Sequence, residues 1–237
     1  MKIYISLLIS LIFVINPSIA GAKLEGYEVV SRNDKENITL YGKKIDDLYR
    51  GFKIDFKGQI YTRPFWNSVT SPTYASQIFY IDINKDKKEE LIITLTTGYG
   101  TGLLWEEVHV FDTLDNRLNV NEMIVDNPLA IIYKNVKTKL SNEEAEIRVG
   151  NKEYKVDITP FEIKAENLFD DVGFGSIIDY EIINKNLLVK VSGQISPASY
   201  IGDVIITYEY RDKMYQSKTI DFITDIDKNP FYGPVKH

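Results

Sequence analysis

Cysteine is absent from the 237 residues of this chain, and histidine occurs only twice. Without cysteine there is no disulfide, no thiolate ligand or nucleophile, and no attachment through a lipid-modified cysteine. A Ser–His–Asp triad would need His109 or His237, since no other histidine exists. His237 ends a tail that contains Pro and Gly, His109 lies in an expected strand, and no G-x-S-x-G motif is present. We therefore assign no catalytic residue and interpret His109 as an ordinary strand histidine.

The chain also lacks an excess of positive charge. It has 28 Lys and Arg residues against 34 Asp and Glu residues, which gives a net charge of −6, and the lysines are scattered along the sequence. A nucleic-acid-binding protein neutralises phosphates with a basic patch or stripe, and this sequence has no such stripe. We therefore expect no nucleic-acid partner.

Long apolar runs are missing apart from one at the N-terminus. Lys2 precedes an apolar run from Ile3 to Ile15, and the small residues Ala20-Gly21-Ala22 follow it. This order is typical of a secretory signal peptide over residues 1–22, and the run is shorter than the ~20 residues of a membrane-spanning helix. We expect a secreted or extracytoplasmic protein with no membrane insertion after cleavage; the alternative is an uncleaved anchor. Because Lys2 is the only charge removed, the net charge changes from −6 to −7.

Aromatic residues are abundant, with 16 Tyr and 11 Phe beside many Ile and Val, and these residue types favour strands. Val204, Ile206, Tyr208 and Tyr210 alternate with their neighbours, which is typical of one face of a half-buried antiparallel strand. Similar runs predict strands at residues 27–31, 52–56, 77–83, 90–96, 105–111, 146–149, 154–158, 177–183, 187–191 and 216–223.

Helical signals are few. A short helix is expected from Pro128 to Val136, capped by Asp126 or Asn127, because Pro suits the first turn and Asx residues suit the cap. A second, weaker pattern runs from Pro160 to Leu168, and a brief helical turn is expected at Ile45–Tyr49. The sequence therefore predicts a mainly β fold of antiparallel sheets with one or two short helices.

The two halves of the chain suggest a repeat. A shift of 96 residues aligns two alternating runs with equal spacing to the next run: Leu91, Ile93 and Leu95 with Leu187, Val189 and Val191. We therefore expect a signal peptide (1–22), an N-terminal β lobe (23–125), a C-terminal β lobe with the short helix (126–225) and a flexible tail (226–237). Chance matching of short alternating runs is the alternative.

One segment carries metal-binding chemistry. Asp82, Asn84 and Asp86 stand at every second position, and Glu90 follows four residues after Asp86. Calcium takes about six to eight oxygen ligands, so these side chains and a backbone carbonyl, assigned to Lys88, supply most of a shell. The alternative is a polar turn in which Asp and Asn accept nearby backbone N–H groups without an ion.

The motif is not an EF-hand, since its sixth and twelfth positions are Lys87 and Ile93 instead of Gly and Glu. The spacing resembles the D-x-[DN]-x-D-G-x-x-[DE]-L loop of FG-GAP/VCBS-type repeats over Ser76 to Asp112, with Lys87 in place of the family's Gly. A non-glycine residue there implies backbone strain or a relaxed loop. The resemblance implies a bacterial extracellular binding or adhesion role, with Ca²⁺ as a structural ion.

Aromatic residues near this motif are candidate ligand contacts. Trp66 lies in an irregular stretch, residues 61–67, while Tyr99 lies in the glycine-rich connection Thr97–Gly102 and Trp105 follows it. Exposed rings stack on sugars or anchor protein partners, so we assign Trp66, Tyr99 and Trp105 to ligand binding. Core filling by the same rings is the alternative.

Paired carboxylates raise the possibility of glycoside hydrolysis. Glu106 and Glu107 are consecutive strand residues that point to opposite faces, and Asp170 and Asp171 fit a turn, so neither pair is assigned. We expect a secreted, non-enzymatic binding or adhesion protein, stabilised by calcium, with an envelope glycan or a protein as partner. The alternatives are a secreted glycan-acting hydrolase with a carboxylate pair and an inhibitor or chaperone-like partner of another secreted protein.

Overall fold

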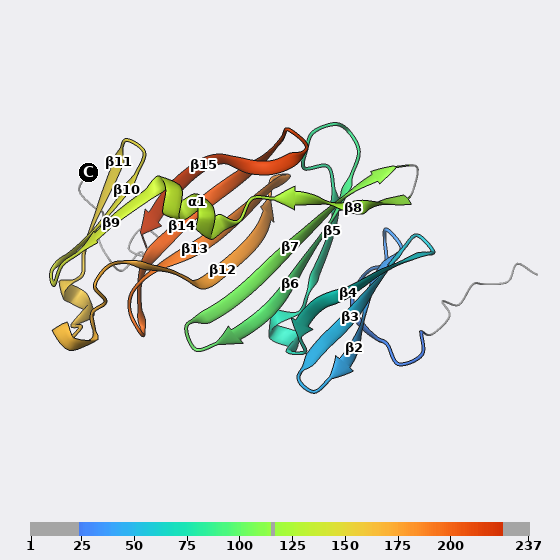
Figure 1. Ribbon diagram of the computed structural model, residues 1–237, viewed down its shortest axis with the longest axis horizontal. Coiled ribbons are helices and arrows are strands. Elements are labelled where there is room, and N and C mark those ends of the chain that lie inside the picture. Colours follow the sequence, from blue (N-terminus) through green and yellow to red (C-terminus); the bar gives the residue numbers. More distant parts are fainter. Residues whose placement is uncertain (1–23, 115–116, 225–237) are drawn as a thin grey trace, which may run out of the picture.

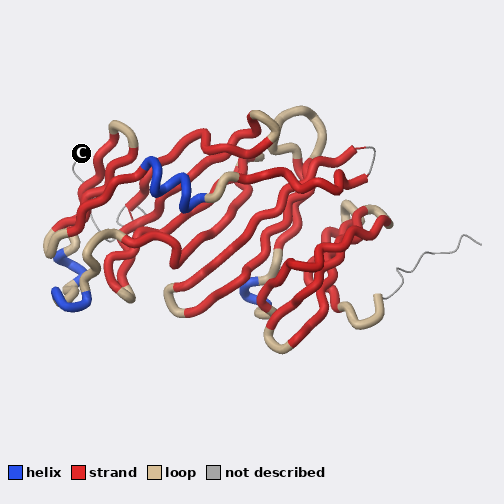
Figure 2. Tube along the Cα trace, viewed as in Figure 1, coloured by secondary structure: helices blue, strands red, loops and turns tan. Residues whose placement is uncertain are grey.

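The computed structural model describes residues 24–114 and 117–224, and the fold is mainly β with antiparallel sheets, as predicted (Figures 1 and 2). The expected signal peptide, the expected tail and His237 lie outside the described residues. The strands follow in chain order: β1 (Glu28–Asn33), β2 (Ile38–Ile45), β3 (Leu48–Phe56), β4 (Gln59–Val69), β5 (Gln77–Ile81), β6 (Glu90–Gly100), β7 (Leu103–Leu114), β8 (Arg117–Val125), β9 (Val136–Leu140), β10 (Glu144–Val149), β11 (Lys152–Asp157), β12 (Gly173–Ile183), β13 (Asn186–Ser196), β14 (Ser199–Arg211) and β15 (Met214–Thr224).

Strands β6 and β7 of the eight-stranded sheet lie between the N-terminal sheet and strands β12 to β15, and the small sheet β9–β10–β11 lies at the far end of the molecule (Figure 1). The sheet β1-β2-β3-β4 covers one face of these strands, and the strands β12 to β15 lie on the other side. Alternation along β6 explains this arrangement, because successive side chains point to opposite faces of a strand. Ile93 packs with the N-terminal sheet, while Ile92 packs with the C-terminal strands. The middle layer is therefore buried on both faces.

The two hydrophobic cores have different compositions. The N-terminal core is built mainly from large aliphatic and aromatic residues: Ile38, Leu40, Phe52, Ile54, Phe56, Leu91, Ile93, Leu95, Phe111 and Leu118. The C-terminal core is richer in β-branched residues and includes Ile92, Val110, Val189, Val191, Val204 and Ile206. Burial of such side chains stabilises a fold by about 1.5–3 kcal/mol each relative to exposure.

Parallel pairings join the two halves of the chain. The eight-stranded sheet runs in the order β12-β13-β14-β15-β8-β7-β6-β5, and β12 also pairs with β7. In the parallel pairs, Ile178 lies beside Trp105 and Tyr215 beside Val125. A closed circuit of six strands results, and strands from both predicted lobes hydrogen-bond within it. The lobe boundary near residue 125 stays a prediction.

The sequence expectation for residues 61–67 was wrong, because this stretch belongs to strand β4. Pro64 lacks a backbone N–H and argues against a strand interior. The register explains the discrepancy: Arg50 pairs with Asn67 and Phe52 pairs with Arg63, so Pro64 lies in an irregularity of the ladder. β4 is also an edge strand of its sheet, where Pro is tolerated.

The helix predicted after residue 127 is present as α1 (Pro128–Asn135). Asn127 caps it, because its side-chain oxygen accepts a hydrogen bond from the backbone N–H of Ala130 at 3.1 Å. The other two helical expectations were wrong. Residues Thr159–Phe161 and Ala165–Asn167 form separate 3₁₀ turns, and Ile45–Tyr49 bridges the β2–β3 hairpin, where Ile45 pairs with Leu48.

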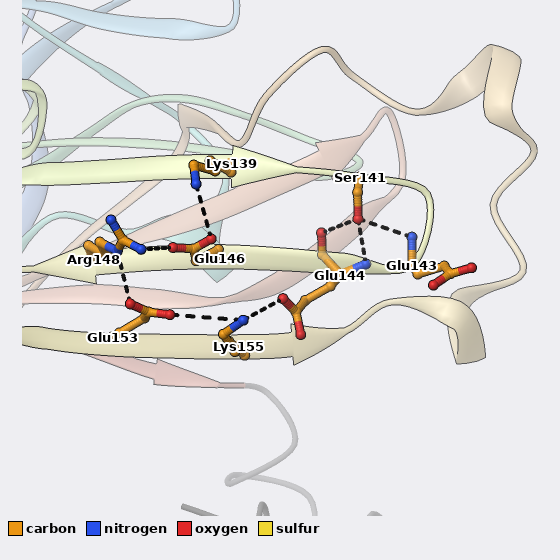
Figure 3. A network of polar contacts seen from close by, with 8 residues as sticks. All are labelled: Lys139, Ser141, Glu143, Glu144, Glu146, Arg148, Glu153 and Lys155. Carbon is orange, nitrogen blue, oxygen red and sulfur yellow. Dashed lines mark hydrogen bonds and ion pairs between the residues drawn. The ribbon is translucent and has the colours of Figure 1, made fainter.

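The small sheet β9–β10–β11 carries opposite charges on its exposed face (Figure 3). Arg148 lies 2.5 Å from Glu146 and 3.0 Å from Glu153, and Lys155 lies 3.1 Å from Glu144. The opposite face, which includes Ile147, packs into the C-terminal core. This alternation orients the small sheet against the larger one.

Within the described residues, no helix has the length and apolar character needed to cross a membrane.

Candidate functional site

The motif segment forms the connection between β5 and β6. β5 ends at Ile81 and β6 begins at Glu90, so residues 82–89 must reverse the chain. Lys85 and Lys87 achieve this with left-handed backbone conformations, with φ of 68° and 74°. Such values cost a non-glycine residue about 1–2 kcal/mol. Lys87 therefore adopts the strained conformation that the family's Gly would take freely.

The side chains of this connection, the β5–β6 loop, turn toward its own backbone. Asp82 accepts hydrogen bonds from the N–H groups of Lys85 at 2.6 Å and Lys87 at 3.2 Å. Asn84 accepts from Asp86 N–H, and Asp86 accepts from Lys88 N–H, both at 2.8 Å. These bonds fit the ion-free turn as well as the metal loop, because each carboxylate retains lone pairs. The loop bonds alone do not choose between the two interpretations.

Glu90 separates the two interpretations. It is fully buried, with 0% of its surface exposed, and its Oε2 accepts the N–H groups of Ile83 at 2.8 Å and Asn84 at 3.3 Å. Within the described ranges, its Oε1 is buried without a hydrogen-bond partner. Burial, together with the charges of Asp86 and Asp82, raises the pKa of Glu90 to about 7. A buried carboxylate oxygen without a partner costs free energy that a cation would recover.

The carboxylates of Asp82, Asp86 and Glu90 form a cluster. Ligand oxygens of Asp82, Asp86 and Glu90 lie within 4.8 Å of one another. Hard oxygen donors on a short loop suit Ca²⁺, which tolerates irregular coordination. The residues therefore fit the ion that the resemblance implies. Asn84 offers a fourth side-chain oxygen in the same loop, while the carbonyl of Lys88 as a ligand stays a prediction.

Sequence reasoning missed Tyr215 on strand β15. Its hydroxyl is buried and, within the described residues, has no hydrogen-bond partner. Burial and then the negative charge of Glu90 raise the pKa of this hydroxyl above its usual range. The Tyr215 hydroxyl, on a strand distant in the sequence, is therefore a second buried oxygen near the β5–β6 loop. No local sequence pattern predicts that Tyr215 lies near Glu90, because this proximity depends on how β15 packs across the sheet.

A cleft of about 660 Å³ lies beside strand β7. Its walls come from β6, β7, β8, β12 and the start of α1, and they include the predicted ligand residue Trp105. Trp105 is 46% exposed, and its ring Nε1 donates to the Gly175 carbonyl at 2.8 Å. A Cβ on Gly98 would lie 2.9 Å from the ring atom Cε3, so glycine lets the indole lie against β6.

Glu106 is the most perturbed carboxyl group of the cleft. It accepts hydrogen bonds from the Tyr180 N–H at 2.8 Å and the Thr96 hydroxyl at 3.4 Å. Burial raises its pKa to about 7, and the charges of Asp179 and Glu181 on β12 add to the effect. Strand alternation predicted that Glu106 and Glu107 point to opposite faces, and both residues nevertheless line the cleft.

His109 lines the cleft, and Trp66 stacks on its ring. The two rings stack with centroids 3.9 Å apart and an interplanar angle of 24°. His109 Nδ1 lies 2.6 Å from Glu122, and its Nε2 lies 3.8 Å from Glu107. Trp66 also packs against the N-terminal core, so it orients His109 from behind.

Tyr99 belongs to a different hollow. Its ring is 48% exposed and stacks on Tyr74 with centroids 4.6 Å apart. The hollow measures about 610 Å³ and includes Gly98 and Pro72 in its walls. The predicted ligand residues Trp66, Tyr99 and Trp105 therefore lie around the β6–β7 hairpin but not in one pocket.

Comparisons with protein-family models, with curated proteins and with solved structures gave no match.

Proposed function

We propose that this chain is an exported, calcium-stabilised β protein that acts by binding an envelope glycan or a protein. The observation that carries the calcium assignment is the buried, unpartnered Oε1 of Glu90 beside Asp82 and Asp86 among the described residues. Calcium would neutralise three converging carboxylates and fix the start of β6, the strand that both cores share. The export assignment rests on the sequence of residues 1–22.

The binding role is supported by two hollows at the end of β6 that is opposite to the β5–β6 loop. The two hollows flank the β6–β7 hairpin and present the partly exposed rings of Trp105 and Tyr99. The indole nitrogen of Trp105 is already bonded to the Gly175 carbonyl, and a partly exposed aromatic ring suits stacking on a ligand. The loop would fix the start of β6, and the hairpin at the other end of this strand would carry the ligand contacts.

Thermal unfolding with calcium or with a chelator tests the metal assignment. At about 100 times the dissociation constant, a ligand adds about 2.7 kcal/mol of stability, which raises Tm by about 5–10 °C in a chain of this size. The double variant Asp82→Ala/Asp86→Ala should lose this shift. The matched control, Glu143→Ala/Asp170→Ala, removes two exposed carboxylates elsewhere and should keep it. Equal melting of the unmodified protein with calcium and with chelator would refute the assignment.

A second candidate function, a glycan-acting hydrolase, is favoured by one observation. Glu106 has a pKa raised to about 7 and lines the cleft, as a general acid would. Both of its oxygens already accept hydrogen bonds, which favours a fixed carboxylate over a proton donor. Release of reducing ends from envelope polysaccharide, lost in Glu106→Gln, would establish the hydrolase and displace the binding role.

A further inference from the structure

The lining of the cleft beside β7 is acidic. Three of its lining residues are the carboxylates Glu106, Glu107 and Glu122. Among the described residues that line it, none is Lys or Arg. Asp179 and Glu181 on β12 add negative potential at Glu106, as the rise of the Glu106 pKa indicates. An occupant of this cleft meets an acidic, partly desolvated wall.

Positive groups stand near the cleft but are already engaged. Lys190 lies 2.5 Å from Glu181 on the neighbouring strand. Arg63 lies over the ring of Phe111, 4.7 Å from its centroid, and interacts with Glu122. Glu107 is 56% exposed at its side chain, and its contact with His109 is a distant 3.8 Å. The wall around Glu106 and Glu107 therefore keeps a negative excess.

His109 supplies an independent observation. It is 9% exposed, it lines the cleft, and within the described residues its buried Nε2 has no hydrogen-bond partner. In the tautomer whose Nδ1 donates to Glu122, at 2.6 Å, Nε2 offers a lone pair to a donor. Nε2 and the Glu107 carboxylate lie 3.8 Å apart. A single donor group between them would satisfy both acceptors.

Trp105 forms the apolar side of the same cleft. The indole is held by the Gly175 carbonyl and by its close approach to Gly98, so its position is fixed before a ligand arrives. A cation near the face of a Trp ring gains about 0.5–2 kcal/mol. Acceptors, negative charge and an aromatic face together suit one chemical group.

We propose that this cleft binds a ligand through a primary ammonium group, held by Glu107, the Nε2 of His109 and the ring of Trp105. The group carries three N–H donors and one positive charge, whereas a neutral sugar hydroxyl supplies a donor without the charge. This inference rests on the proposed binding function and names its ligand class. The ammonium group belongs to an amino sugar or to an aliphatic amine.

Calorimetric titration of the full chain tests the proposal. Glucosamine carries an ammonium group where N-acetylglucosamine carries a neutral acetamido group, and 1,5-diaminopentane carries ammonium groups without a sugar ring. Glucosamine should bind at least about tenfold more tightly than its N-acetyl form. Binding of diaminopentane as well assigns the site to the ammonium group alone, whereas its failure assigns the site to amino sugars.

Variants locate the site. Glu107→Gln keeps the size of an exposed side chain and should weaken glucosamine binding about tenfold, while Glu143→Gln, remote and exposed, should leave it unchanged. Gly98→Ala should also weaken binding, because its Cβ displaces Trp105.

Equal affinity for the two sugars, or no measurable binding of either amine, would overturn the proposal. Calcium-dependent melting of the same sample is read separately. A calcium shift without amine binding removes only the ligand class, whereas amine binding without a calcium shift removes only the metal assignment. Retained binding in Glu107→Gln would place the amine elsewhere and also overturn the proposal.

Discussion

At the scale of single residues, the β5–β6 loop shows how spacing becomes chemistry. Asp82, Asn84 and Asp86 alternate along the chain, and each accepts a backbone N–H of the loop, which aims the side chains inward. Glu90 differs, because it is the first residue of β6 and is buried by the sheets around it. The spacing predicts which side chains are candidate ligands. Burial makes the charged form of Glu90 unfavourable unless a cation lies beside it.

Lys87→Gly should stabilise the loop. Lys87 holds a φ of 74°, which Gly adopts without the clash of a Cβ. We expect the free energy of unfolding to rise by about 1 kcal/mol and calcium affinity to rise with it. Chemical unfolding and calcium titration measure both quantities. The control is Lys88→Gly, where φ is not positive; a similar gain there would show that strain at Lys87 is not the cause.

Glu106 should make stability depend on pH. Its pKa rises from 4.5 to about 7 on folding, mainly through burial, so the folded state holds the proton more tightly than the unfolded state. The contribution of Glu106 to the free energy of unfolding should therefore be greatest below about pH 4.5 and should fall as pH rises toward about 7. The expected loss is about 1–3 kcal/mol.

The measurement for Glu106 is denaturant unfolding at several pH values. Glu106→Gln cannot ionise and should flatten this part of the profile, whereas Glu107→Gln, at a 56% exposed side chain, should follow the unmodified protein. An unchanged slope in Glu106→Gln would show that the carboxyl is not desolvated in the fold.

At the scale of elements, charge and burial divide the small sheet β9–β11 between its faces. Adjacent residues of β10 illustrate the division, since Ile147 is fully buried and Arg148 lies in the ion-pair network of Figure 3. Exposed ion pairs contribute about 0–1 kcal/mol, whereas a buried aliphatic side chain contributes several times more. The buried apolar face therefore contributes most of the stability of the small sheet, and the exposed ion pairs contribute little.

Ile147→Ala and Arg148→Ala test this division on neighbouring residues. Ile147→Ala should lower the free energy of unfolding by about 2–5 kcal/mol, because it leaves a cavity in the C-terminal core. Arg148→Ala should cost at most about 1 kcal/mol, and added salt should shrink that cost. Equal losses in urea unfolding would mean that the network, and not burial, holds the sheet.

At the scale of the whole molecule, the middle layer makes the two cores interdependent. β6 sends Ile92 into one core and Ile93 into the other, and the β12–β7 and β15–β8 pairings tie strands of both halves together. Neither core is complete without strands β6 and β7. The chain should therefore unfold as one cooperative unit.

Calorimetry of Ile92→Ala and Ile93→Ala tests this coupling. Each variant should show a single transition with Tm lowered by about 5–15 °C, because either cavity weakens the shared layer. Two separate transitions, each shifted by only one variant, would instead establish the independent lobes 23–125 and 126–225 expected from the sequence.

Residue patterns by themselves determined the β class, eleven of the strands in outline, the helix after Asn127 and the oxygen donors of the β5–β6 loop. These features depend on residues close in the chain, where alternation, capping and turn chemistry act. The strand β4 escaped prediction because Pro64 lies at an irregularity that only pairing with β3 creates. Tertiary packing decided the rest: Tyr215 beside Glu90, Asp179 beside Glu106, and Trp66 behind His109. Their physical effect comes from burial and from charges brought together across sheets, which no local pattern encodes.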